Sequence, residues 1–200
     1  MSDKSNKKTV DGRRLRSARC KQSIIEACEH LMSEGNLVPT AQMISDRAEV
    51  PIRTFFRHYP DMETLFSAVD EAMRPEYGRI FTETKSEGGL SDRIASVVEL
   101  HAKSWDQNKP VLKSTKAQLW RYRVLRDNYA KVNLFLRKDL NKRIPELNGV
   151  AKDTRELIDG LMSFEMWERL RDHQNLSREK SIHIIRRSVE LLLQTGIETG

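Results

Sequence analysis

The sequence lacks the features that mark several common classes of protein. It has only two cysteines, Cys20 and Cys28, which lie eight positions apart in one predicted helix. Their Cα atoms would be about 12 Å apart, which is too far for a disulfide, so we expect reduced thiols. No apolar run approaches the roughly 18 residues that a membrane helix needs. The first eight residues are polar and contain no secretion signal, and we therefore expect a cytoplasmic protein.

The patterns that accompany catalysis are missing as well. The five histidines show no spacing typical of metal ligands, and none pairs with a cysteine as a nucleophile would require. The sequence contains no glycine-rich phosphate loop and no nucleophile elbow. We therefore predict neither an enzyme, nor a metal site, nor a bound cofactor.

Positive charge is concentrated at the N-terminus. Residues 1–21 contain eight lysines and arginines against two aspartates, and this surplus equals the net charge of +6 of the whole chain. The remaining residues are balanced in charge. Such a basic segment is either a solubilising tail or a contact to nucleic acid.

Helical periodicity dominates the chain, and period-two alternation is absent. We predict an all-α fold of about nine helices. Pro110 is expected to open a helix of its own, and Asp153-Thr154-Arg155-Glu156 resembles a capping box that opens a helix reaching Asp172. The predicted helices are 13–34, one after Thr40, 51–59, one from Asp61, one from Ser91, one from Pro110, 128–144, 154–172 and one from Ser177.

Residues 40–60 carry the clearest functional pattern. Thr40 is a good N-cap for a short helix, and Pro51 suits the first turn of a second short helix. A tight turn at Ala48-Glu49-Val50 joins the two. This spacing is typical of a helix-turn-helix, whose second helix enters the major groove of DNA.

Residues 40–65 contain a longer pattern, made up of Thr40, Ile44, Ala48, Val50, Thr54, Phe55, Phe56, Arg57, His58, Tyr59, Pro60, Asp61, Glu63 and Leu65. This pattern resembles the N-terminal signature of the TetR family. The resemblance implies a helix-turn-helix DNA-binding domain with a basic arm at residues 1–66 and an effector-binding, dimerising helical domain at 67–200. It also implies a homodimer on double-stranded operator DNA, acting as a repressor that a small-molecule effector releases. A ligand-independent DNA-binding or protein-interaction module on the same fold is the alternative.

Three positions depart from the family pattern. Glu49 stands where a turn glycine is usual, so we expect a strained turn. Phe56 replaces a tyrosine and Met62 a lysine, which removes two common phosphate contacts. We expect the basic first helix and arm to compensate, through Arg13, Arg14 and Arg16.

The resemblance also assigns roles within the helix-turn-helix. The groove-facing start of the recognition helix comprises Pro51, Ile52, Arg53 and Thr54. Arg53 either reads a guanine edge or clamps a phosphate. Phe55 and Phe56 are expected in the core, and Tyr59 either donates to a phosphate or packs. The expected contacts to the DNA backbone are Thr40, Thr54, Arg57 and His58.

Sites in the C-terminal part are expected on large apolar residues. An effector pocket is predicted around Trp105, Trp120, Met162 and Phe164, with Lys103, Gln118 and Glu165 as possible polar contacts; plain core is the alternative. The helices after residue 154 are apolar on more than one face, which indicates a dimer interface or a single large core. The predicted interface residues are Ile158, Trp167, Ile185, Val189 and Leu192.

Overall fold

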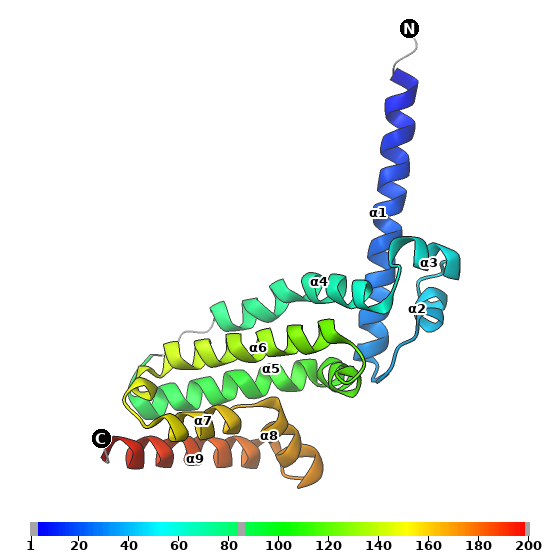
Figure 1. The fold of residues 1–200 in the computed structure, drawn as a ribbon. Helices are drawn as coiled ribbons and strands as arrows, with labels where there is room; N and C mark the ends of the chain where they lie inside the picture. The colour runs from blue at the N-terminus through cyan, green and yellow to red at the C-terminus, as the bar shows by residue number, and fades with distance from the viewer. Residues whose placement is uncertain (1–3, 84–86, 199–200) are drawn as a thin grey trace. The chain divides into compact units, whose positions relative to one another are not determined.

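The computed structural model describes residues 4–83 and 87–198. Within them the chain forms nine α-helices, one 3-10 turn and one π-helical turn, without a strand, which confirms the all-α prediction (Figure 1). The elements are α1 (Lys4–Ser33), α2 (Ala41–Arg47), α3 (Ile52–His58), α4 (Met62–Glu83), α5 (Leu90–Gln118), α6 (Arg123–Arg143), η1 (Pro145–Asn148), α7 (Lys152–Leu161), α8 (Phe164–Glu168), η2 (Arg169–His173) and α9 (Arg178–Glu198).

The chain divides into two compact units. The first contains Met1–Pro75 and Pro110–Asn128, and the second contains Glu76–Lys109 and Tyr129–Gly200. Helices α4, α5 and α6 therefore contribute residues to both units. In the described part of the chain, no helix is both long enough and apolar enough to cross a membrane.

Local signals set the limits of α2. The hydroxyl oxygen of Thr40 accepts a hydrogen bond from the amide of Met43 at 3.3 Å, as an N-cap does. At the other end, the amide of Val50 donates to the carbonyl of Ser45 at 3.0 Å, and Glu49 has a φ of 55°. This is a left-handed C-terminal stop of the kind that glycine usually provides.

Similar signals set α3 and the start of α4. The carbonyl of Pro51 accepts hydrogen bonds from the amides of Thr54 and Phe55, so the proline is the N-cap of α3, one position before the first helical position that was predicted for it. Asp61 then caps α4, because its carboxylate accepts from the amide of Thr64 at 2.7 Å. The first unit is held by an apolar core to which helices α1 to α6 all contribute, and its buried residues include Ile24, Cys28, Ile44, Phe55, Tyr59, Leu65, Phe66, Val69, Val111 and Leu125.

Three helix predictions were wrong. Helix α1 begins at Lys4, so the expected arm before residue 12 is helical backbone. Pro110 lies inside the continuous helix α5. Proline costs one main-chain hydrogen bond there, but Trp105 and Val111 are buried on either side of it and keep both halves of the helix packed.

The third error concerns the predicted helix 154–172. Helix α7 begins after Ala151, which provides no side-chain cap, so the expected capping box does not form. The helix ends with Met162 as its C-cap, and the hydroxyl of Ser163 caps α8 by accepting a hydrogen bond from the amide of Met166 at 3.2 Å. Buried positions on both sides of this break, Ile158 and Trp167, show that tertiary packing outweighs the local helical pattern.

Candidate nucleic-acid interface and ligand site

The outer face of α3 is basic and aromatic. Arg53, Phe56 and Arg57 are exposed, and their i, i+3, i+4 spacing places them on one side of the helix. Phe55 points the other way into the core, with its ring 5.2 Å from that of Phe56. Because adjacent helical residues are turned well apart, both phenylalanines cannot face the core, and the prediction that Phe56 does was wrong: its exposed fraction is 47%.

The other predicted DNA contacts surround this face. Pro51 and Thr40 are exposed, whereas Ile52 and Thr54 are half-buried at the start of α3. The Thr40 hydroxyl oxygen is engaged in the cap of α2, but its hydrogen remains a donor for an acceptor such as a phosphate.

Tyr59 packs. It is buried, and its hydroxyl donates to the main-chain carbonyl of Lys21 at 3.3 Å, which ties the end of α3 to α1. Burial raises the pKa of its hydroxyl. Of the two predicted roles, packing is therefore the one that the structure shows.

His58, next to Tyr59, is half-buried, and its Nε2 has no hydrogen-bond partner among the described residues. Burial lowers the pKa of His58, and the positive charges of Arg57 and Lys21 lower it further. A neutral imidazole adds no charge to the DNA-facing side at neutral pH.

The described part of α1 supplies additional positive charge. Arg13, Arg14 and Arg16 are exposed, and Arg16 donates to the carbonyl of Gly12 at 3.2 Å. The side chains of Lys4, Lys7 and Lys8 lie outside the described part of the structure. Arg47 of α2 differs from these arginines because it forms an ion pair with Glu34.

The residues predicted to line a ligand pocket do not gather at one place. Trp105, Met162 and Phe164 are buried in the second unit. Trp120 belongs to the first unit and has an exposed fraction of 81%, so this residue lines no interior site in the chain. It lies two residues beyond Gln118, the last residue of α5, where helical periodicity no longer indicates which side chains are buried.

The possible polar contacts are equally scattered. Lys103 is exposed, and Glu165 accepts a hydrogen bond from the hydroxyl of Tyr129 at 2.6 Å. Gln118 is buried in the first unit, where its amide nitrogen donates to the carbonyl of Ser114 at 3.3 Å.

A row of rings in the second unit was missed by the sequence reasoning. The ring of Phe81 lies 5.5 Å from that of Phe135 and 5.5 Å from that of His101, and His101 lies 5.4 Å from Trp105. Trp105 in turn lies 5.7 Å from Trp167. Only the His101–Trp105 pair is visible in the sequence, as an i, i+4 pair in α5. The fold brings the other rings together from α4, α6 and α8.

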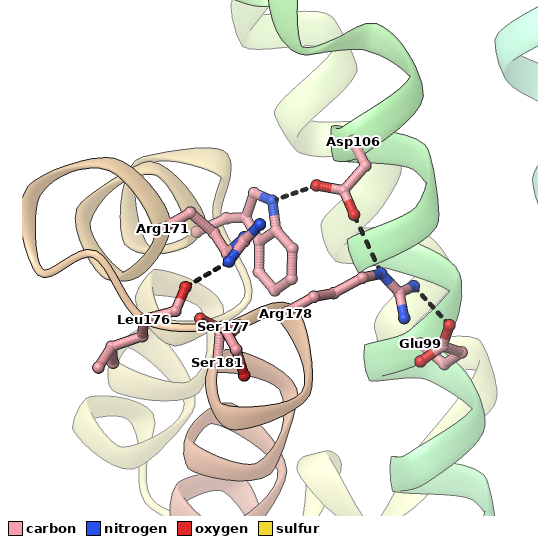
Figure 2. Close-up of polar contacts among 8 residues, drawn as sticks. Glu99, Asp106, Arg171, Leu176, Ser177, Arg178 and Ser181 are labelled. Atoms are coloured by element: carbon pink, nitrogen blue, oxygen red, sulfur yellow. Dashed lines mark hydrogen bonds and ion pairs between the residues drawn. The ribbon is translucent and has the colours of Figure 1, made fainter.

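A polar network surrounds the inner end of this row. Asp106 accepts from the indole nitrogen of Trp167 and from Nε of Arg178, each at 3.0 Å. Arg178 also donates to Glu99, and Arg171 donates to the carbonyl of Leu176 (Figure 2). The network therefore joins α5 to α8 and to the first residue of α9.

The predicted dimer-interface residues form part of the second unit's own core. Ile158, Trp167, Ile185 and Val189 are fully buried within the single chain, and Leu192 is half-buried. The first four residues therefore lie in the chain's own core, which was the alternative to a dimer interface. Helices α7 and α9 pack against each other, and the large apolar side chains exposed on them, among those that the structure describes, are Leu157 of α7 and Leu191 of α9.

The architecture is that of a helix-turn-helix protein with a second, all-helical unit. No family model and no curated protein matches the sequence. Among solved structures, the chain is similar to a transcriptional regulator from Rhodococcus sp. RHA1, with a TM-score of 0.65 at 11% identity over 90% of this chain and 97% of that one.

Two further solved structures are similar. The multidrug binding protein EbrR, complexed with imidazole, has a TM-score of 0.60 at 14% identity, over 84% of this chain and 88% of that one. A TetR transcriptional regulator from Rhodococcus sp. RHA1 has a TM-score of 0.51 at 19% identity, over 91% and 97%. These similarities establish the fold, which is that of TetR-type regulators, and none of the three is described as an enzyme.

Proposed function

We propose that this chain is a homodimeric, sequence-specific transcriptional repressor of the cytoplasm, which a small-molecule effector releases from operator DNA. The observation that carries the proposal is the outer face of α3, where Arg53, Phe56 and Arg57 are exposed while Phe55 and Tyr59 anchor the helix from behind. A short helix held rigidly from one side, with arginines on the other, suits insertion into a major groove.

Residues 1–66 are the proposed DNA-binding domain. Arg53 lies in the first turn of α3, the part of a recognition helix that reaches base edges, and its guanidinium suits the two acceptors of guanine. In this proposal Arg57 and Thr40, both exposed, hold the phosphate backbone. The exposed Arg13, Arg14 and Arg16 replace the phosphate contacts that Phe56 and Met62 cannot make.

Residues 67–200 are the proposed effector-binding and dimerising domain. EbrR, which shares the fold, is named as a multidrug binding protein, and this supports a ligand site in the helical domain here. An effector acts only through its different affinities for the DNA-competent and released states. DNA and effector must therefore weaken each other's binding by the same factor.

Dimerisation supplies the second recognition helix. Two copies of α3 placed about one helical turn of DNA apart, roughly 34 Å, would read the half-sites of a palindrome. Leu157 and Leu191 are exposed apolar residues on the packed pair α7 and α9, and they support placing the partner against these helices.

The test is a titration of the protein against the DNA upstream of its own gene and against an unrelated duplex, each at two salt concentrations. The proposal expects preference for the upstream fragment and a steep loss of affinity with salt. Equal, weak binding to both fragments would contradict operator recognition. Replacing Arg13, Arg14 and Arg16 together by alanine should weaken binding to both fragments and reduce the salt slope by about 0.9 for each phosphate that is no longer neutralised.

The control for the arginine variant is Lys180→Ala, which removes an exposed positive charge from α9. It should leave both the affinity and the salt slope unchanged. If the triple arginine variant behaves like this control, the compensating role of α1 is wrong, while the role of α3 stands.

A further inference from the structure

His101 is a buried polar residue that the fold leaves without a hydrogen bond. It lies in α5 with an exposed fraction of 1%, and neither ring nitrogen has a partner among the described residues. An unsatisfied buried polar group costs about 1–3 kcal/mol, so such groups are rare unless they serve a purpose. An apolar ring at this position would avoid that cost.

The surroundings of His101 are aromatic. Phe81 and Trp105 both meet the imidazole edge to face, at interplanar angles of 83° and 87°. Phe81 is in turn covered by Phe135, whose exposed fraction is 44%, while Trp167 at the other end is fully buried. The row of rings therefore reaches from the surface of the second unit to its interior, with His101 in the middle.

The imidazole of His101 is neutral at pH 7. Its pKa is lowered to about 4, mainly by burial and in smaller part by the positive charge of Arg143. The Met162 backbone lies near enough to oppose this shift without making a hydrogen bond of ordinary geometry. A neutral imidazole offers one donor and one acceptor.

The positive charge that acts on His101 is already engaged. Arg143 forms an ion pair with Asp139 at 2.6 Å and donates to the main-chain carbonyl of Phe81. An anionic ligand would have to compete with Asp139 for this charge, and any charged ligand would lose its hydration in the aromatic surroundings. An uncharged ligand meets neither obstacle.

We propose that His101 is the polar anchor of the effector site and selects an uncharged, planar aromatic molecule bearing a hydroxyl group. The hydroxyl donates to the free acceptor nitrogen of His101, while the ligand's ring takes the place of the Phe81 ring between His101 and Phe135. This inference rests on the proposed effector response and specifies the chemical class of the effector.

The Phe81 side chain is the part that moves. Because Arg143 holds the Phe81 carbonyl, the ring can turn about its side-chain bonds while the main chain stays in place. Phe135 lies outside Phe81, and its exposure marks the side from which a ligand approaches. Ring contacts contribute about 0.5–1.5 kcal/mol each beyond the area they bury, which favours a planar aromatic ligand.

Three matched probes test the chemistry: 2-naphthol, naphthalene and 2-naphthoate. Binding to the full-length protein is followed by calorimetry and by tryptophan fluorescence in a Trp120→Phe background, which removes the exposed indole and leaves Trp105 and Trp167 as reporters. The proposal expects 2-naphthol to bind at least about tenfold more tightly than either of the other two probes, the difference that one good hydrogen bond provides.

The variant His101→Phe keeps a ring and removes the hydrogen bond. It should weaken 2-naphthol binding by about tenfold and leave naphthalene binding unchanged. His101→Gln, which keeps a donor and an acceptor, should retain part of the preference for 2-naphthol. The control is His183→Phe, an exposed histidine of α9.

Three results would overturn the proposal: no 2-naphthol binding up to about 1 mM, tighter binding of 2-naphthoate, or a preference that survives His101→Phe. DNA affinity without ligand, measured on the same variants, separates this inference from the proposed function. If His101→Phe binds the upstream DNA like the wild type but keeps its preference for 2-naphthol, only the ligand assignment fails. If the wild type does not distinguish the DNA fragments, the proposed function fails whatever the probes do.

Discussion

The indole nitrogen of Trp167 lies 3.0 Å from a carboxylate oxygen of Asp106, and the other oxygen of that carboxylate accepts from Nε of Arg178 at 3.0 Å. One side chain of α5 thus fixes the buried ring of α8 and the start of α9 (Figure 2). Trp167 is the inner end of the aromatic row that contains His101, so the hydrogen bond from its indole nitrogen to Asp106 holds that end of the row in position.

Removing this carboxylate should destabilise the second unit. Asp106→Ala leaves the buried indole N–H of Trp167 without an acceptor, and we expect a loss of about 1–3 kcal/mol in the free energy of unfolding. Glu99→Ala breaks only the more exposed ion pair to Arg178 and should cost less than about 1 kcal/mol. Urea unfolding of both variants measures the difference, and equal losses would show that the Trp167 hydrogen bond contributes nothing.

The two adjacent phenylalanines of α3 should behave oppositely. Phe55→Ala empties a fully buried site and should cost about 3–5 kcal/mol of stability. Phe56→Ala removes a half-exposed ring and should cost much less, because much of that ring already faces solvent in the folded protein. Thermal unfolding monitored by circular dichroism decides this. A large loss of stability for Phe56→Ala would place that ring in the core after all.

The turn between α2 and α3 should be improved by glycine. Glu49 has a φ of 55°, a conformation that costs an ordinary side chain about 1–2 kcal/mol and glycine almost nothing. Glu49→Gly should therefore raise the free energy of unfolding, partly offset by the greater freedom of glycine in the unfolded chain. Glu49→Ala keeps the strain and is the control. An equal gain in both variants would point to the charge of Glu49 instead of its backbone.

This turn illustrates what the sequence could predict. The helix-turn-helix depends on signals within a few residues of each other. These are the N-cap at Thr40, the left-handed backbone at Glu49 where glycine is usual, and the N-cap at Asp61, and all three were predicted from the sequence. Short-range rules failed where distant packing outweighed them. Pro110 lies within α5 because buried residues on both sides of it keep the helix packed. The predicted capping box at Asp153 does not form.

The second unit was harder to predict for a related reason. Periodicity showed that α7 and α9 have more apolar residues than one face needs, but not which face meets the chain's own core. Ile158 and Ile185 are interior, and Leu157 and Leu191 are the exposed members. The row from Phe135 to Trp167 joins four helices, and no pattern along the chain indicates it.

His101 should make stability depend on pH. Its pKa falls from 6.5 to about 4 on folding, so between these values the unfolded chain binds a proton that the folded chain excludes. Stability is therefore unaffected by this group above about pH 6.5 and falls as the pH drops towards 4, by up to about 3 kcal/mol. His101→Phe should lack this component. Urea unfolding at several pH values measures it as the difference between the variant and the wild type, and a difference that stays constant with pH would contradict the buried neutral imidazole.

The most direct test of the central claim is the effect of Arg53→Ala on binding to the upstream fragment and to the unrelated duplex. Arg53 is exposed in the first turn of α3, so its removal should leave the fold intact. If Arg53 reads a base, affinity for the upstream fragment should fall by about 1–3 kcal/mol, roughly 5- to 150-fold, with little change for the unrelated duplex. Equal losses on both would make Arg53 a phosphate contact. Unchanged affinity for both fragments would contradict the account that α3 is the recognition helix.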